Sequence, residues 1–253
     1  MHNDKASQFH SLHVRGEPLV LFNAWDAGSA RIVAGAGARA IATGSWSVAA
    51  ANGFEDGEQL PLSFALDNLR RMVDAVTQPV TIDLESGYGE TPAAVASTVA
   101  AAVQAGAVGC NLEDSFPATG QLREIAEQAT RLAAARAAAD AAGVPMFINA
   151  RTDVFFQKPA AAHDLAMVDA ALQRARAYAD AGANGLFVPG VVAEDLIARL
   201  AAASPLPVNV MVMPGAPSRA RLAELGVARI SHGPGPWRGA MQWLAEATRA
   251  AMA

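Results

Sequence analysis

The sequence contains a single cysteine, Cys110, and this scarcity excludes two kinds of structural framework. One thiol cannot form an internal disulfide, and it cannot supply the cysteine pairs of a zinc cluster. Cys110 lies in the apolar run AVGCNLED, where a cysteine is expected to behave as a small buried hydrophobic residue. We therefore expect neither disulfide stabilisation nor a reactive thiol.

Basic charge and long apolar runs are also scarce. The chain has 19 Lys and Arg against 24 Asp and Glu, a formal net charge of -5, so it offers no positive field for nucleic acid or a membrane surface. The polar N-terminus MHNDKASQFHSLHVRG lacks the apolar centre of a signal peptide, and no later run reaches the length of a membrane span. These features predict a cytoplasmic protein.

What the chain does contain is a regular alternation of short β-type runs and alanine-rich helical stretches. Several of the helical stretches end in a similar glycine-containing junction before the next β-type run, as in AGARAI, AGAVGC and AGANGL. Eight such units in 253 residues predict an α/β fold, a single (β/α)8 TIM barrel domain over residues 1–253. A doubly wound open sheet is the alternative, but NAWDAGSA stands where its G-x-G-x-x-G turn would follow the first strand. The eight β-type runs are LVLFNAWD, AIATGSWS, PVTIDLES, VGCNLEDS, PMFINART, GLFVPG, PVNVMVM and ARISHG.

Two carboxylates end the third run, PVTIDLESGYG. Asp83 and Glu85 occupy alternate positions, so strand geometry predicts that both side chains point to one side. Like charges that face one point repel unless a cation or a proton lies between them. We interpret the pair as ligands of a hard divalent metal; the alternative is that both simply face solvent.

The neighbouring strand ends strengthen the metal interpretation. Glu113 ends the next run, and a set of oxygen ligands without histidine or cysteine indicates Mg²⁺ or Mn²⁺. Arg151, one run further on, suits a substrate carboxylate or a developing oxyanion, although an ion pair with Asp153 or Glu113 would explain it as well. Together, a metal and an arginine acting on one oxygen would stabilise an enolate.

Other strand ends supply candidate substrate-binding groups. Amide groups at the small turn formed by Gly44, Ser45 and Trp46 could bind a second anionic group. Asn209, at the end of the seventh run, is a further candidate because chemistry in a barrel gathers at the carboxyl ends of strands.

The motifs WDAGSARIV, GFED, DLESGYG, NLEDS, INARTD and GVARISHGP, in this order, resemble the isocitrate lyase and phosphoenolpyruvate mutase superfamily over nearly the whole chain. The resemblance implies a Mg²⁺-dependent (β/α)8 barrel that acts on 2-oxo or 2-hydroxy carboxylates. It implies that Asp83 is the direct metal ligand, with Glu85 and Glu113 acting largely through water. It further implies that Arg151 binds the oxyanion, that Asp56 is a mobile-loop carboxylate beside the reacting group, and that the subunits form homo-oligomers, dimers or tetramers, which often exchange their last helix.

The chain departs from this pattern after the fourth run. Isocitrate and methylisocitrate lyases have a K-[KR]-C-G-H loop with a catalytic cysteine there, whereas this chain has SFPATGQLREI. Phosphonopyruvate enzymes have an asparagine or threonine in a lysine-containing loop, of which only Thr119 remains. Oxaloacetate decarboxylation requires least of this loop, so we expect a metal-dependent carbon–carbon lyase of that kind. The alternatives are a C–P bond enzyme, a 2-oxo acid binding protein with little turnover, and an unrelated barrel with structural carboxylates.

Overall fold

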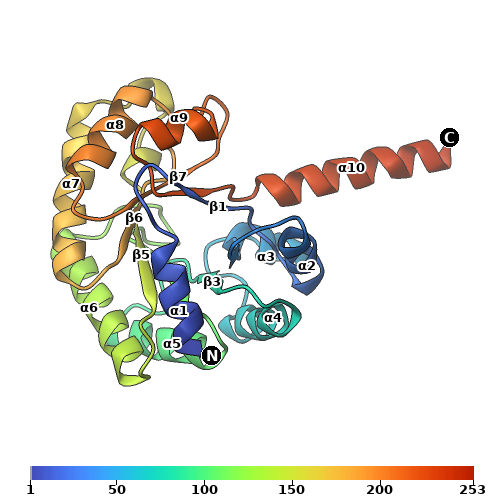
Figure 1. The fold of residues 1–253 in the computed structure, drawn as a ribbon, viewed down its shortest axis with the longest axis horizontal. Helices are drawn as coiled ribbons and strands as arrows, with labels where there is room; N and C mark the ends of the chain where they lie inside the picture. The colour runs from blue at the N-terminus through green and yellow to red at the C-terminus, as the bar shows by residue number, and fades with distance from the viewer. Residues whose placement is uncertain (1) are drawn as a thin grey trace.

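The computed structural model describes residues 2–253, which form eight parallel strands surrounded by helices (Figure 1). All eight β-type runs form strands, so the predicted alternation is confirmed. The strands are β1 (Leu19–Leu21), β2 (Ile41–Ala42), β3 (Val80–Asp83), β4 (Gly109–Glu113), β5 (Phe147–Arg151), β6 (Gly185–Phe187), β7 (Val208–Met211) and β8 (Arg229–Ser231).

The sheet closes into a barrel. Its strand order is β1-β8-β7-β6-β5-β4-β3-β2, so β2 to β8 lie side by side in sequence order, and β8 pairs with β1. An isolated parallel bridge between Ala24 and Thr43 joins the chain just beyond β1 to the chain just beyond β2. The barrel prediction is therefore confirmed, and the open doubly wound sheet is excluded.

Helices follow the strands and cover the outside of the barrel. The junction glycines behave as predicted: Gly37, Gly106 and Gly182 have φ angles of 95°, 97° and 92°, a left-handed conformation that ends a helix at little cost for glycine. The α-helices are α1 (His2–Ser11), α2 (Ala27–Gly35), α3 (Ser45–Ala51), α4 (Leu62–Ala75), α5 (Pro92–Gln104), α6 (Ile125–Ala141), α7 (Leu165–Asp180), α8 (Glu194–Ala203), α9 (Arg219–Glu224) and α10 (Gly235–Met252), and the 3₁₀ turns are η1 (Val154–Phe156) and η2 (Ala160–Ala162).

Helix α1 packs at the amino end of the barrel. Phe9 is fully buried and makes edge contacts with the rings of His13 and Phe147. A side chain at Gly109 would collide with the Phe9 ring, because the nearest atom would be 2.7 Å from the added carbon. Aromatic side chains therefore fill this end, and Cys110 is buried in the same core, as predicted.

Helix α10 projects away from the barrel (Figure 1). None of its residues is buried, and Trp243 and Leu244 expose 68% and 50% of their surfaces. None of the helices within residues 2–253 is both long enough and apolar enough to cross a membrane.

Candidate active site

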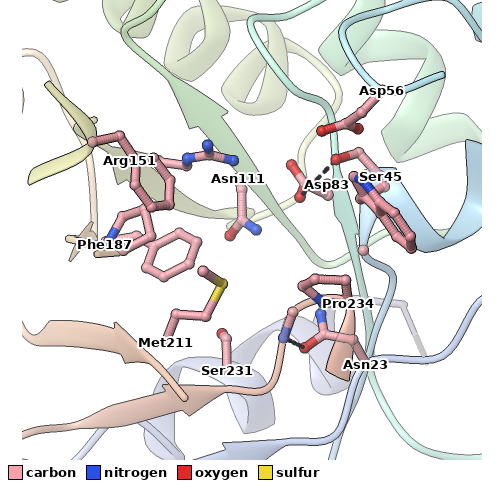
Figure 2. Close-up of a pocket in the computed structure, with 15 residues that line it drawn as sticks. Asn23, Ser45, Asp56, Asp83, Asn111, Arg151, Phe187, Met211, Ser231 and Pro234 are labelled. Carbon is pink, nitrogen blue, oxygen red and sulfur yellow. Dashed lines mark hydrogen bonds between the residues drawn. The ribbon is translucent and has the colours of Figure 1, made fainter. Parts of the chain in front are cut away.

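A cavity of about 170 Å³ opens at the carboxyl end of the barrel, where the predicted chemistry was expected. In Figure 2, Asp56, Asp83 and Ser45 lie on one side of it, and Arg151, Phe187 and Met211 lie on the other. Its lining residues are Asn23, Gly44, Ser45, Trp46, Asp56, Asp83, Asn111, Arg151, Phe156, Phe187, Pro189, Met211, Ser231, Gly233 and Pro234.

Asp83 is the last residue of β3 and reaches the cavity directly. Its backbone N–H donates to the Thr43 hydroxyl at 2.9 Å, which holds the end of β3 against the segment after β2. The Ser45 hydroxyl donates to a carboxylate oxygen of Asp83 at 3.4 Å (Figure 2). Much of the hydrogen-bonding capacity of the Asp83 carboxylate is therefore free for a ligand in the cavity.

Glu85 departs from the predicted strand alternation. The strand ends at Asp83, and Glu85 adopts a left-handed φ of 51°, so the two-residue repeat does not extend to it. Its buried carboxylate accepts backbone N–H groups of Gly57 and Glu58 at 2.8 and 2.6 Å, and it is not part of the cavity lining. Burial and the nearby Asp56 raise the pKa of Glu85 to about 7. Glu85 thus anchors the loop that contains Asp56.

Asp56 is in that loop and lines the cavity. Burial, and then the charge of Asp83, raise the pKa of the Asp56 carboxyl above its usual range. The Glu58 carboxylate ties this loop to the segment after β3, since it accepts hydrogen bonds from the Ser86 hydroxyl at 2.6 Å and the Tyr88 backbone N–H at 2.8 Å. These hydrogen bonds hold the loop in place, so Asp56 lies beside Asp83.

Arg151 ends β5 and combines both roles considered for it. Its guanidinium bonds Glu113 at 2.7 Å and Asp153 at 2.6 and 3.0 Å, and the same side chain lines the cavity. Burial lowers the pKa of Arg151, but the two carboxylates outweigh this effect and raise it. Glu113 consequently lies behind Arg151 as its partner and is not part of the cavity lining.

The remaining predicted residues divide into two groups. Gly44, Ser45 and Trp46 line the cavity, and α3 begins at Ser45, so its first backbone N–H groups have no partners within the helix. Asn209 does not reach the lining: it is buried in the barrel and its amide donates to the Ser231 hydroxyl at 3.2 Å. Position at a strand end did not reveal which layer of the barrel the side chain would occupy.

Asn111 is a lining residue that the sequence analysis missed. It precedes Glu113 by two positions in β4, and strand register pairs it with Asp83. The two-residue repeat in NLED could have indicated its inward direction, but it lies within a run that was interpreted as apolar core.

The donor set fits a magnesium ion held mainly through water. Within residues 2–253, no three His, Cys, Asp or Glu side chains are arranged to hold a metal directly. Mg²⁺, however, usually keeps several waters and takes only one or two carboxylates, and Asp83 supplies one on the cavity lining. Burial first, and then the charges of neighbouring carboxylates, raise the pKa values of Asp56 and Glu85, and a cation at this point would stabilise their ionised forms.

Comparisons with known proteins agree with the fold. The chain is 34% identical over 190 residues to an oxaloacetate decarboxylase of a Bradyrhizobium species, covering 72% of this chain and 60% of that protein. It is 31% identical over 206 residues to the 2-methylisocitrate lyase of Salmonella typhimurium, covering 79% and 67%. A crystal structure of a Burkholderia cenocepacia protein, provisionally named a phosphonomutase, superimposes with a TM-score of 0.97 at 60% identity, covering 99% and 100%.

The family comparison extends over almost the entire barrel. Residues 9–252 match the model of the phosphoenolpyruvate phosphomutase family, and the relatives are named as lyases and mutases that break C–C or C–P bonds. The chain therefore belongs to the phosphoenolpyruvate phosphomutase family, within the superfamily that also contains the isocitrate lyases, and it is an enzyme of that superfamily.

Proposed function

We propose that this protein is a Mg²⁺-dependent lyase that cleaves a C–C bond beside a 2-oxo carboxylate, with oxaloacetate decarboxylation as its reaction. The observation that supports this most directly is that Arg151, Asp83 and Asp56 line one small cavity. The 34% identity to an oxaloacetate decarboxylase points to the same chemistry.

Arg151 is placed to stabilise the charge that develops on the substrate. When the bond between C3 and its carboxylate breaks, the bonding electrons form an enolate at C2 and C3, and CO₂ leaves. A guanidinium held by Glu113 and Asp153 does not need to reorient when this charge appears, so it favours the transition state. Asp83 would hold the metal, which supplies Lewis-acid stabilisation of the same oxygen when bound.

Asp56 is assigned the role of proton donor in the last step of the reaction. Oxaloacetate dianion and one proton give pyruvate and CO₂, so C3 of the enolate must be protonated. Burial and the charge of Asp83 raise the pKa of Asp56, so this carboxyl holds a proton more readily than an exposed aspartate, and the loop presents it on the lining beside Asp83. The Gly44–Trp46 turn is assigned to the substrate's C1 carboxylate.

The cavity wall that faces Asp83 and Asp56 favours loss of a carboxylate over transfer of a phosphonate. Phe187 and Met211 lie on the same side as Arg151 in Figure 2, and Arg151 is the only Lys, Arg or His among the lining residues of the described chain. Apolar side chains disfavour a charged carboxylate beside them, and this unfavourable interaction is lost when the group leaves as neutral CO₂. A C–P bond enzyme acting on phosphonopyruvate remains the second candidate, because the 60% identical relative is provisionally named a phosphonomutase.

Pyruvate release from oxaloacetate, with and without Mg²⁺, tests this function. The wild-type rate should exceed the metal-catalysed background, and Arg151→Ala should lower kcat/KM by at least about 100-fold, as for loss of an oxyanion donor. Conversion of phosphonopyruvate, followed by phosphorus NMR, would instead support the second candidate. Oxalate binding with no turnover of either compound would contradict both and indicate a binding protein.

We also propose that the protein is a homo-oligomer whose subunits exchange α10. The groove beside α2 is lined by Leu19, Val20, Ile32 and Val33, and Ile32 is 75% exposed although it is a large aliphatic side chain. The last helix of a (β/α)8 barrel normally covers β8 and β1, but here it projects outward with Trp243 and Leu244 uncovered. The apolar side chains of α10 from a second copy of the chain would cover this exposed apolar groove.

Sedimentation analysis tests the exchange. Wild-type protein should sediment as a dimer or a larger assembly, and Trp243→Glu should shift it towards the monomer, because a charge would enter an apolar interface. Gln242→Glu, at the adjacent exposed position, is the matched control and should leave the assembly unchanged. A monomeric wild type would contradict the proposal.

A further inference from the structure

Asn111 lies on the lining of the cavity without a role in the chemistry assigned to Asp83, Asp56 and Arg151. It is 5% exposed, its strand register pairs it with Asp83, and in Figure 2 it appears between Asp83 and Arg151. A polar side chain at this position either completes an internal hydrogen-bond network or contacts the bound ligand. Its contacts decide between the two.

The amide of Asn111 has only one orientation. Its Oδ1 accepts from Arg229 Nη2 at 3.1 Å and from Asn149 Nδ2 at 2.9 Å. A guanidinium can only donate, so exchanging the oxygen and nitrogen of the amide would set two donors against each other. The Nδ2 group therefore faces away from Arg229, and it has no partner among the protein atoms of residues 2–253.

Arg229 increases the strength of this donor. It is 1% exposed in β8, and the contact with Asn111 is its one side-chain hydrogen bond in the described chain, since Nε and Nη1 have no partner. A buried cation with so few contacts is costly, and an apolar residue of similar volume would usually serve stability as well or better. Its charge instead polarises the Asn111 amide, whose N–H groups become better donors to an anion.

We propose that Asn111 is a substrate-binding residue that donates an N–H to an anionic oxygen of the 2-oxo acid, and that Arg229 is a positioning residue that sets its orientation. The identity of the ligand rests on the proposed function. The direction of the donor follows from the contacts of Asn111 alone. Asn111 thereby adds a neutral donor to a pocket wall otherwise dominated by the carboxylates of Asp83 and Asp56.

Calorimetric titration with oxalate, a planar dianion that resembles the enolate, tests this in the presence of Mg²⁺. Asn111→Leu should bind oxalate about 10- to 100-fold more weakly, as expected for a lost hydrogen bond to a charged group. Thr81→Val is the matched control: its buried hydroxyl in β3 has no partner and does not line the cavity, so oxalate affinity should be unchanged.

Two further variants separate direct binding from folding. Asn111→Asp conserves volume and gives Arg229 an anionic partner, so the melting temperature should hold or rise while oxalate binding falls by more than about 100-fold. Arg229→Met should weaken oxalate binding, and Arg229→Gln, which still donates to Asn111, should restore much of it.

The outcomes distinguish this inference from the proposed function. If wild-type protein binds oxalate and Asn111→Leu binds it within twofold of wild type, the assignment of Asn111 is overturned and the proposed function stands. Equal oxalate affinity in Arg229→Met and wild type overturns the positioning role of Arg229. If wild-type protein does not bind oxalate, the proposed function fails, and this inference fails with it.

Discussion

The two ends of the barrel satisfy their polar groups in opposite ways. At the carboxyl end, the carboxylates of Asp56, Asp83 and Glu85 converge, and the pKa values of Asp56 and Glu85 are raised by burial and by mutual repulsion. At the amino end, α1 fills the opening with Phe9 and with His13, whose ring stacks on Phe147 at 3.8 Å. The carboxyl end keeps negative charge that a ligand would neutralise, whereas the amino end is filled by aromatic rings, among which burial lowers the pKa of His13.

Backbone conformation follows the same division. The non-glycine residues with positive φ in the described chain are Glu58, Glu85 and Tyr88, and all three belong to the two interlocked loops at the carboxyl end. Such conformations cost about 1–3 kcal/mol each and persist only where surrounding contacts compensate. The comparison indicates that the carboxyl end is organised for ligand binding and the amino end for stability.

The largest expected effect is at the carboxyl end. Asp83→Ala should lower metal-dependent kcat/KM by at least about 1,000-fold, because the metal supplies several kcal/mol of charge stabilisation and 1.4 kcal/mol corresponds to a factor of ten. The melting temperature should change little, since the Asp83 carboxylate makes few internal bonds. Activity assays and thermal unfolding check both parts; retained activity would refute the metal assignment.

The reverse pattern is expected for Phe9→Ala at the amino end. Removal of this fully buried ring should lower the free energy of unfolding by about 3–5 kcal/mol, because it leaves a cavity against Phe147 and His13. The kcat of the folded fraction should stay within about twofold of wild type, because the ring lies outside the cavity lining. Urea unfolding and steady-state kinetics measure the two quantities. A large loss of kcat with unchanged stability would break the division between the two ends.

The smallest effect concerns acid stability. Burial lowers the pKa of His13 from 6.5 to about 3, so between these values the unfolded chain binds a proton that the folded chain excludes. The contribution to stability is complete above pH 6.5 and falls by about 1.4 kcal/mol per pH unit below it. His13→Phe, which keeps an aromatic ring, should show a shallower loss of stability between pH 6.5 and 5. Parallel slopes in urea unfolding at these pH values would contradict the assignment.

Much of the fold was predictable because its signals are local. Each junction glycine, such as Gly106 or Gly182, follows a helix whose alanine content and length are visible in the sequence, and each is left-handed in the structure. Asp83 and Arg151 were also predictable as members of one site, because strand ends of a parallel barrel share an edge.

Other features depended on contacts between distant segments. Glu85 was expected to point with Asp83, but the strand ends two residues before Glu85, and the loop N–H groups of Gly57 and Glu58 bind its carboxylate. Asn209 was expected to bind substrate and Asn111 was not considered, although only Asn111 lines the cavity. The metal, the oligomeric state and the cytoplasmic location stay predictions.

The sequence by itself determined the barrel, the family and the edge at which the chemistry gathers, because periodicity, helix-ending glycines and motif order are properties of neighbouring residues. Only the tertiary structure decided which polar side chains reach the cavity and which way they face. Register across strands brings Asn111 beside Asp83, and Arg229, 118 positions away in the chain, orients its amide. Such contacts arise only when the barrel closes, and no local pattern encodes them.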